Sequence, residues 1–319
     1  MRRRHLLASP ALLLGGGAAS QSWPDRPVRL IVPFGGGGPA DAVARMAMEG
    51  ASQALGQRIT IENRPGAGAV VGTEAVFRAP ADGATFLLAT VSHVVSAGII
   101  ARLPYDPDKD FRGVALTGTV PLVVVVHPDN PARTFPELLA RMREPGEHDY
   151  GTSGVGSAQH LGGALLGAMA GLRLNQVPYR GNPSALTDLA GGRLTFVMES
   201  TATTVPLVRA GTLKALAVTG PARSALLPDV PTVAESGVPG FEAYTWNAIL
   251  ARAGTPESAI RGMNAAVNAG LKSPTTGDRL RNAGIEVTDS MTPDMVDAFV
   301  AEQGAKWRPL LTAAGVRPE

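Results

Sequence analysis

The stretch VRLIVPFGGGGPAD, residues Val28 to Asp41, runs from an apolar segment typical of a β-strand into four consecutive glycines and then into a helix-like segment. Glycine has no β-carbon, so Gly35 to Gly38 can turn their N–H groups toward a ligand. The helix that follows adds unpaired N–H groups and the positive end of its dipole. The stretch therefore predicts a cradle for an anion or, alternatively, only a tight turn between a strand and a helix.

A second segment of this kind lies far along the chain at YGTSGVGSAQH, Tyr150 to His160. It combines glycines with hydroxyl groups and again precedes an apolar helical stretch. Two such loops can hold the two ends of one small molecule, so the pair favours the anion cradle over the simple turn.

Residues 1–20 have the pattern of a secretory signal peptide, with a basic start, an apolar core from Leu6 to Leu14 and small residues at 15–20. The pair Arg3-Arg4 leaves twin-arginine export open. The apolar core is shorter than the about 20 residues that span a bilayer. We therefore predict export to the periplasm, with an N-terminal membrane anchor as the alternative.

Removal of the signal peptide changes the charge balance. The full chain has 29 Lys and Arg against 27 Asp and Glu, and loss of three arginines leaves 26 basic residues, a net charge of −1. Such a chain, with no basic run and no interleaved aromatic residues after residue 20, is not typical of a nucleic-acid-binding protein. The absence of cysteine excludes thiol catalysis, disulfides and cysteine-ligated zinc.

Apolar runs alternate with helical patterns through almost the whole chain, which indicates an α/β protein with crossover helices. Thr134-Phe135-Pro136-Glu137 has the spacing of a capping box, and Thr255-Pro256-Glu257 and Thr292-Pro293-Asp294 place proline at the first helical position. The predicted strands are Val28 to Val32, Arg58 to Glu62, Thr85 to Ala89, Leu122 to Val126, Leu174 to Val177, Leu194 to Met198, Leu213 to Val218 and Ala248 to Ala251.

About 300 mature residues, with an apolar content of 45% in the full chain, suffice for two domains. No low-complexity linker separates them, so we predict that Val120 to Val126 and Phe241 to Leu250 cross between two lobes. Lobe 1 is then residues 21–122 plus 246–319, and lobe 2 is residues 123–245. A cleft between two α/β lobes is suited to capturing a small ligand by hinge closure.

Ten motifs in fixed order resemble the Bug receptors, the periplasmic solute-binding proteins of the tripartite tricarboxylate transporter family. The resemblance extends from about Trp23 to the C-terminal helix. The motifs are WPDRPVRLIVPFGGGGPADAVAR, IENRPGAGAVVG, APADGATFLLAT, LPYDPDKDF, YGTSGVGSAQHL, VPYRG, ALTDLAGGRL, LKALAVTGPARS, LPDVPTVAESGVPGF and AGTP.

This resemblance implies a two-lobe "Venus flytrap" fold with two parallel or mixed sheets, flanked by helices and joined by crossover strands. It also implies a non-enzymatic receptor that delivers a small organic carboxylate to a membrane permease. Ligands in the family include citrate and other di- or tricarboxylates, acidic amino acids and aromatic carboxylates. We expect a monomer without a cofactor or metal.

The resemblance places the first ligand loop on Pro33 to Asp41, where main-chain N–H groups and ordered water are expected to contact one carboxylate. The family commonly has prolines at the positions of Gly35 and Gly36 and a threonine at that of Ala40. The loop of this chain is therefore looser and costs more to order. Its candidate ligand-binding residues are Phe34, Gly36, Gly37, Gly38 and Asp41.

The second family loop falls on Gly151 to His160, where hydroxyl groups and the N–H groups of Gly154 to Ser157 are expected to face the distal carboxylate. The VPY[KR]G motif places Tyr179 and Arg180 at a strand end beside the cleft. Arg180 either bonds the ligand or is solvated at the rim. The candidates in the loop itself are Thr152, Ser153, Gly154, Ser157 and His160.

Further candidates follow two other predicted strands. Glu199 stands where the family usually has aspartate, and it would select a cationic amine on the ligand or orient neighbouring hydroxyls. Thr90, Ser92 and His93 replace small and hydroxylic residues of the family. They either line the pocket or cap a helix.

An enzyme of the same shape is the main alternative. A hydrolase or acyl-transfer enzyme would use Ser153 or Ser157 with His160, but Val155 occupies the place where the nucleophile elbow of Ser153 needs glycine. No acid is evidently placed to orient His160.

Nucleotide and metal sites are also disfavoured. The glycines of Gly66 to Gly72 end one residue late for a dinucleotide fingerprint. The histidines lack metal-ligand spacing, and Asp106 to Asp110 lacks the glycine and glutamate of a calcium loop. We therefore predict a receptor, with the enzyme and a ligand-sensing adaptor as alternatives.

Overall fold

The structure, a computed structural model, describes residues 23–179, 182–288 and 290–313. The predicted signal peptide, residues 1–20, lies outside the described residues. The elements are β1 (Val28–Val32), α1 (Pro39–Leu55), β2 (Ile59–Asn63), the short helix η1 (Ala67–Ala69), α2 (Val70–Arg78), β3 (Thr85–Ala89), α3 (Val91–Ile99), β4 (Phe111–Val126), α4 (Phe135–Met142), β5 (Asp149–Thr152), α5 (Ala158–Ala170), β6 (Asn175–Pro178), α6 (Asn182–Ala190), β7 (Phe196–Ser200), α7 (Thr201–Arg209), β8 (Lys214–Val218), β9 (Tyr244–Arg252), α8 (Glu257–Lys272), α9 (Pro274–Asn282) and α10 (Pro293–Ala313).

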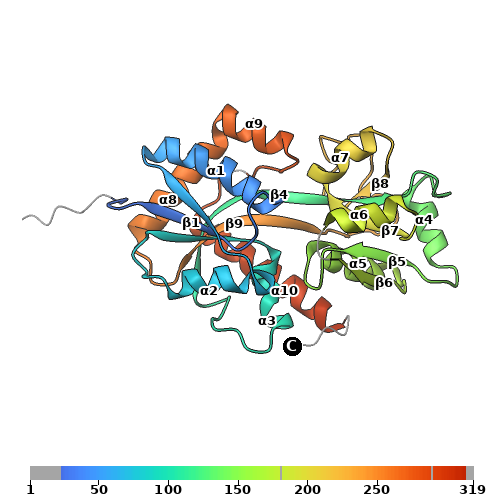
Figure 1. Cartoon of the computed structure of the whole chain (residues 1–319), viewed down its shortest axis with the longest axis horizontal. Coiled ribbons are helices and arrows are strands. Elements are labelled where there is room, and N and C mark those ends of the chain that lie inside the picture. The colour runs from blue at the N-terminus through green and yellow to red at the C-terminus, as the bar shows by residue number, and fades with distance from the viewer. Residues whose placement is uncertain (1–22, 180–181, 289, 314–319) are drawn as a thin grey trace, which may run out of the picture.

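Two lobes are joined by the long strands β4 and β9 (Figure 1). The first lobe contains β1 to β3 with α1 to α3 and α8 to α10, and the second contains β5 to β8 with α4 to α7. The predicted crossings, Val120 to Val126 and Phe241 to Leu250, overlap β4 and β9. Because both strands extend into both lobes, the lobe boundaries 21–122 plus 246–319 and 123–245 stay a prediction.

The sheet is mixed, with strand order β2-β1-β3-β9-β4-β7-β5-β6 and β8 paired to β4. Within each lobe the strands β1 to β3 and β5 to β7 are parallel. β4 carries the chain out of the first lobe and β9 brings it back, so these two strands pair antiparallel. The shared β4 makes the two lobe sheets continuous.

Helix starts follow the sequence signals closely. The Thr134 Oγ1 accepts a hydrogen bond from the Glu137 N–H at 3.3 Å, which confirms the predicted cap of α4. α10 begins at Pro293 as predicted, whereas α8 begins at Glu257, one residue later than expected. Among the described residues, no helix combines the length and apolar character needed to cross a bilayer.

Candidate ligand-binding site

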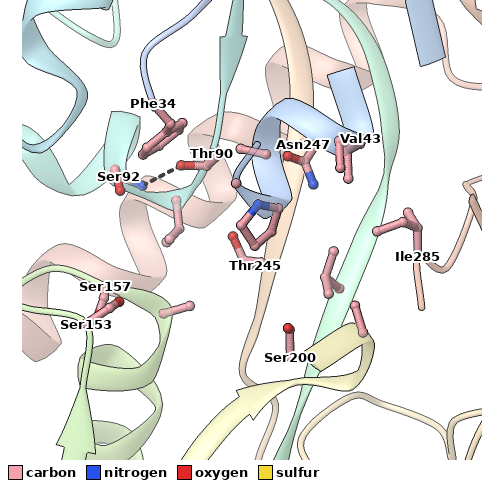
Figure 2. Close-up of a pocket in the computed structure, with 18 of the residues that line it drawn as sticks. Phe34, Val43, Thr90, Ser92, Ser153, Ser157, Ser200, Thr245, Asn247 and Ile285 are labelled. Carbon is pink, nitrogen blue, oxygen red and sulfur yellow. Dashed lines mark hydrogen bonds between the residues drawn. The ribbon is translucent and has the colours of Figure 1, made fainter. Parts of the chain in front are cut away.

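A cavity of about 540 Å³ lies between the two lobes, within the size range of small-molecule sites. The lobes touch beside it: the Thr201 hydroxyl donates to the Gly284 carbonyl at 3.1 Å. The lobes also approach each other closely at Gly156 of the second lobe and Ile99 of the first. A β-carbon added to Gly156 would lie 2.3 Å from Ile99 Cδ1, so this contact has room only for glycine unless Ile99 shifts. Figure 2 shows the lining, whose polar side chains are Thr90, Ser92, Ser153, Ser157, Gln159, Glu199, Ser200, Thr245 and Asn247.

Four helices begin at this cavity. The lining includes the first residues of α1, α3, α5 and α7 or the residues that precede them: Gly38 and Pro39, Thr90 to Ser92, Ser157 to Gln159, and Ser200 and Ala202. N–H groups in the first turn of a helix have no partner within the helix, and the positive end of the dipole lies there. Two of these helices belong to each lobe, so both lobes offer positive helix ends to one ligand.

Among the described residues that line the cavity, Glu199 has the only ionisable side chain. Glu199 is 1% exposed; its carboxylate accepts hydrogen bonds from Gln159 Nε2 at 3.2 Å and from the Ser200 N–H at 2.7 Å. No lysine or arginine is found in this described lining. Here the attraction for an anion therefore comes from helix ends and neutral dipoles.

Only part of the first loop reaches the cavity. Phe34, Gly36 and Gly38 line it, but Gly37 does not. The N–H of Gly37 donates to Asp41 Oδ2 at 2.9 Å, so this predicted ligand donor is already used. Position 37 favours glycine because its φ is +80°, a conformation that other residues rarely adopt. Lack of space is not the reason, because an added β-carbon would meet no atom within 4 Å.

Asp41 anchors the first loop instead of lining the cavity. This buried carboxylate also accepts hydrogen bonds from Arg45 Nε at 2.8 Å and Asn63 Nδ2 at 2.9 Å. The hydrogen bond from Arg45, more than those from Gly37 and Asn63, lowers the pKa of Asp41 to about 2. The predicted ligand contact of Asp41 is thus replaced by a structural role.

The second loop also uses its own donors. The N–H of Gly154 donates to Thr152 Oγ1 at 3.2 Å, and the N–H of Gly156 donates to His160 Nδ1 at 3.1 Å. The N–H of Ser157 donates to the Gly154 carbonyl at 3.3 Å. Of the N–H groups expected to face the ligand, those of Gly154, Gly156 and Ser157 are therefore used within the loop. Thr152, Gly154 and His160 shape the loop and are not in the lining.

Ser153 and Ser157 do line the cavity. Ser153 Oγ donates to Gln159 Oε1 at 3.0 Å. Ser157 Oγ donates to the Gly154 carbonyl at 2.7 Å and, as the cap of α5, accepts from the His160 N–H at 3.2 Å. Burial lowers the pKa of His160, which keeps its ring neutral as the acceptor for Gly156 requires.

Two other candidates lie away from the cavity. The Nε2 of His93 donates to the Pro107 carbonyl at 3.2 Å, its ring packs against Phe111, and burial lowers its pKa to about 4. The Tyr179 hydroxyl donates to Asp188 at 2.7 Å. Neither side chain is in the lining, so their ligand contacts stay predictions that this cavity does not support.

Three candidates remain: Thr90, Ser92 and Arg180. Thr90 and Ser92 line the cavity, and Thr90 also caps α3 by accepting from the Ser92 N–H at 3.4 Å. Thr90 therefore both lines the cavity and caps a helix, the two roles that the sequence left open. Arg180 lies outside the described residues, so its ligand contact stays a prediction.

Sequence analysis missed two polar residues on β9, Thr245 and Asn247. Alternate residues of a strand share one face. Thr245 and Asn247 line the cavity, while Trp246 between them packs on Phe299 of α10 with ring centroids 5.5 Å apart. The predicted crossing strand contained both residues, and its alternation places them on one face without indicating which face borders the cavity.

The opposite wall of the cavity is apolar. Val43 and Met46 of α1, Val120 and Leu122 of β4, and Ile285 contribute to it. Figure 2 shows Val43 and Ile285 across the cavity from Ser153 and Ser157. Among the described residues, no group of three metal-ligating side chains is found.

The model of the tripartite tricarboxylate transporter family receptor, TctC, matches residues 43–316. The chain belongs to this family. Over 315 residues the receptor is 36% identical to the "UPF0065 protein in tcbD-tcbE intergenic region" of Pseudomonas sp. strain P51, with 97% of this chain and 94% of the relative covered.

Two solved structures resemble the receptor over nearly its whole length. The periplasmic binding protein BugD has a TM-score of 0.80 and 33% identity, covering 93% of this chain and all of that one. Rpa4515 from R. palustris, solved with adipate, has a TM-score of 0.82 and 34% identity with the same coverage. These likenesses confirm the predicted family and fold. Members of the family are solute-binding receptors, so the chain is a receptor and not an enzyme.

Proposed function

We propose that this receptor captures a small organic carboxylate in the periplasm and, acting as a monomer, delivers it to the membrane permease of a tripartite tricarboxylate transporter. The observation that carries the proposal is the meeting of four helix N-terminal ends, those of α1, α3, α5 and α7, at one cavity. Helix N-terminal ends bind carboxylates through their free N–H groups and their dipoles.

The ligand carboxylate accepts hydrogen bonds from first-turn N–H groups and from hydroxyl groups that donate to no other described residue. Thr90 and Ser92 lie at the start of α3, and Ala158 and Gln159 lie at the start of α5. The adipate complex of Rpa4515 supports a carboxylate ligand, and the periplasmic BugD supports the compartment. The family description supports the permease partner.

A thermal-shift screen tests the ligand class. The panel contains acetate, benzoate, succinate, malate, adipate and citrate, with adipamide as an uncharged control. An acid that binds only the folded receptor should raise its melting temperature by about 5 °C at 100 times its Kd, and more at higher concentration. The proposal fails if no acid raises the melting temperature, or if adipamide raises it as much as adipate does.

Replacement of Ala158 by proline tests the helix ends directly. Proline is tolerated at the first helical position, and Ser157 before it has the extended conformation that proline requires. Ala158→Pro removes one N–H from the cavity, so we expect it to weaken acid binding about tenfold, measured by calorimetry.

Glu257→Pro is the matched control, because Glu257 begins α8, which does not line the cavity. Equal affinities of the two variants would contradict binding at the α5 end. Delivery is tested by uptake of the bound acid after deletion of the gene. Unchanged uptake would contradict delivery and favour a sensing adaptor.

A further inference from the structure

Asn247 is a buried polar side chain that the described chain leaves without a partner. It lies in the middle of β9, is 4% exposed and lines the cavity. Its backbone carbonyl accepts a hydrogen bond from the Thr117 hydroxyl at 2.8 Å. No other described residue hydrogen-bonds its amide. The amide faces the cavity and makes no described hydrogen bond within the fold, so its donor and acceptor are available to a ligand.

The surrounding sheet leaves Asn247 open to the cavity. Its neighbour across the β4–β9 pair is Gly118, which has no side chain, and the register shifts between Leu116 and Gly118. On the other side, β3 ends at Ala89, opposite Ala248, so no residue of β3 pairs with Asn247. Figure 2 shows the Asn247 side chain beside Val43, above Thr245.

We infer that Asn247 determines specificity by hydrogen-bonding a second oxygen function of the ligand, in addition to the carboxylate at the helix ends. The inference rests on the proposed function. An amide both donates and accepts, so Nδ2 pairs with a carbonyl or carboxylate and Oδ1 pairs with a hydroxyl. The ligand class is then an oxygen-substituted acid, such as a hydroxy acid, an oxo acid or a diacid.

A plain alkyl or aryl monoacid fits this position less well. Its hydrocarbon part would pack against Val43 and Ile285. It would also displace water from Asn247 without replacing the hydrogen bonds between that water and the amide. A site built to hydrogen-bond a ligand oxygen rejects the analogue that lacks it, because the buried polar group is then left unpaired.

The variant Asn247→Leu tests the inference, since leucine has a similar shape and no polar side-chain atom. Two matched pairs of acids are used: malate with succinate, and 4-hydroxybenzoate with benzoate. In wild type we expect at least one pair to show about tenfold tighter binding of the hydroxylated member, by calorimetry. In Asn247→Leu that preference falls to about twofold or less.

The same variant has a second readout that distinguishes recognition from support of the fold. Asn247→Leu removes no described hydrogen bond within the fold, so the melting temperature of the ligand-free receptor should not fall. Asn268→Leu is the control, because the Asn268 amide lies in α8 and donates to Asn264 Oδ1 at 3.1 Å and to the Met291 carbonyl at 3.2 Å. It should lower the melting temperature and leave the acid preference unchanged.

Asn247→Ala, which adds no bulk, serves as the second variant and should also lose the preference. The inference is overturned if either Asn247 variant keeps the preference, if wild type shows none, or if Asn247→Leu melts below wild type. If no acid of either pair or of the thermal-shift panel binds wild type, the proposed function itself fails.

Discussion

The two glycine-containing loops that border the cavity are held in shape by different chemistry. In the first loop the buried carboxylate of Asp41 gathers the Gly37 N–H and the side chains of Arg45 and Asn63. In the second, neutral acceptors on Thr152 and His160 receive N–H groups of the loop. Both loops therefore use predicted ligand donors to fix their own conformation, which is why we propose that helix ends bind the ligand. The anchors differ in strength, since charge-assisted hydrogen bonds are about twice as strong as neutral ones.

The largest expected effect comes from removing the charged anchor. Asp41→Ala deletes three hydrogen bonds to a buried carboxylate, so we expect a loss of about 3 kcal/mol in the free energy of unfolding, measured with urea. Asp278→Ala is the control, because it breaks only the exposed pair with Arg281 and should cost less than about 1 kcal/mol. Similar losses in the two variants would contradict the claim that the buried Asp41 carboxylate stabilises the fold more than an exposed ion pair does.

Low pH should destabilise the first loop, because it protonates the carboxylate of Asp41. Its folded pKa of about 2 lies below its ordinary value of 3.8. A lowered pKa stabilises the fold fully above about pH 4, and this stabilisation, about 2 kcal/mol, is lost as the pH falls toward 2. The difference in unfolding free energy between wild type and Asp41→Asn should therefore shrink over this range. A difference independent of pH would show that the charge is not the anchor.

Glycine to alanine changes should distinguish the loops more finely. Gly156→Ala combines a φ of +76° with a β-carbon 2.3 Å from Ile99 Cδ1, whereas Gly37→Ala has a φ of +80° and open space. We expect losses of about 2 kcal/mol and about 1 kcal/mol in unfolding free energy. Adding Ile99→Val, which removes the Cδ1 atom, should relieve part of the Gly156→Ala loss. Additive losses in the double variant would contradict the contact.

The smallest effects concern the helix caps. Ser157 caps α5 with its hydroxyl, whereas Gly38 precedes α1 and has no capping side chain. Ser157→Ala should cost about 1 kcal/mol, and Gly38→Ser should gain a few tenths, both measured by thermal unfolding. A loss with Gly38→Ser would mean that the serine β-carbon, 3.4 Å from the Gly35 carbonyl oxygen, disturbs the first loop.

Local signals predicted local structure well. The run Val28 to Val32 is β1 with the predicted bounds, because a parallel strand that is largely buried needs mostly apolar residues, and only Arg29 in it is exposed. The strand predicted over Leu122 to Val126 is longer and begins at Phe111. Glycines and Pro121 weaken the strand pattern there, and only pairing with the distant β9 maintains the strand.

The site was predictable only where a residue acts without a distant partner. Ser92 and Ser153 line the cavity. Hydroxyls beside glycines marked the loop of Ser153, whereas Ser92 was proposed from the family resemblance. His93 and Tyr179 lie outside the lining because their partners, Pro107 and Asp188, are set by tertiary packing. Asn247 was missed because nothing local indicates which face of a crossing strand borders a cavity.

The pairing of β4 with β9 has a mechanical consequence. The two strands pair from Phe111 opposite Arg252 to Pro121 opposite Tyr244, so the lobes are joined by a hydrogen-bonded ribbon. Such a ribbon bends out of its plane but resists sliding of one strand along the other. We expect the lobes to swing toward one another without slipping lengthwise. We then expect the opposing helix ends to face each other in the same register at each closure, so that ligand length as well as ligand chemistry affects binding.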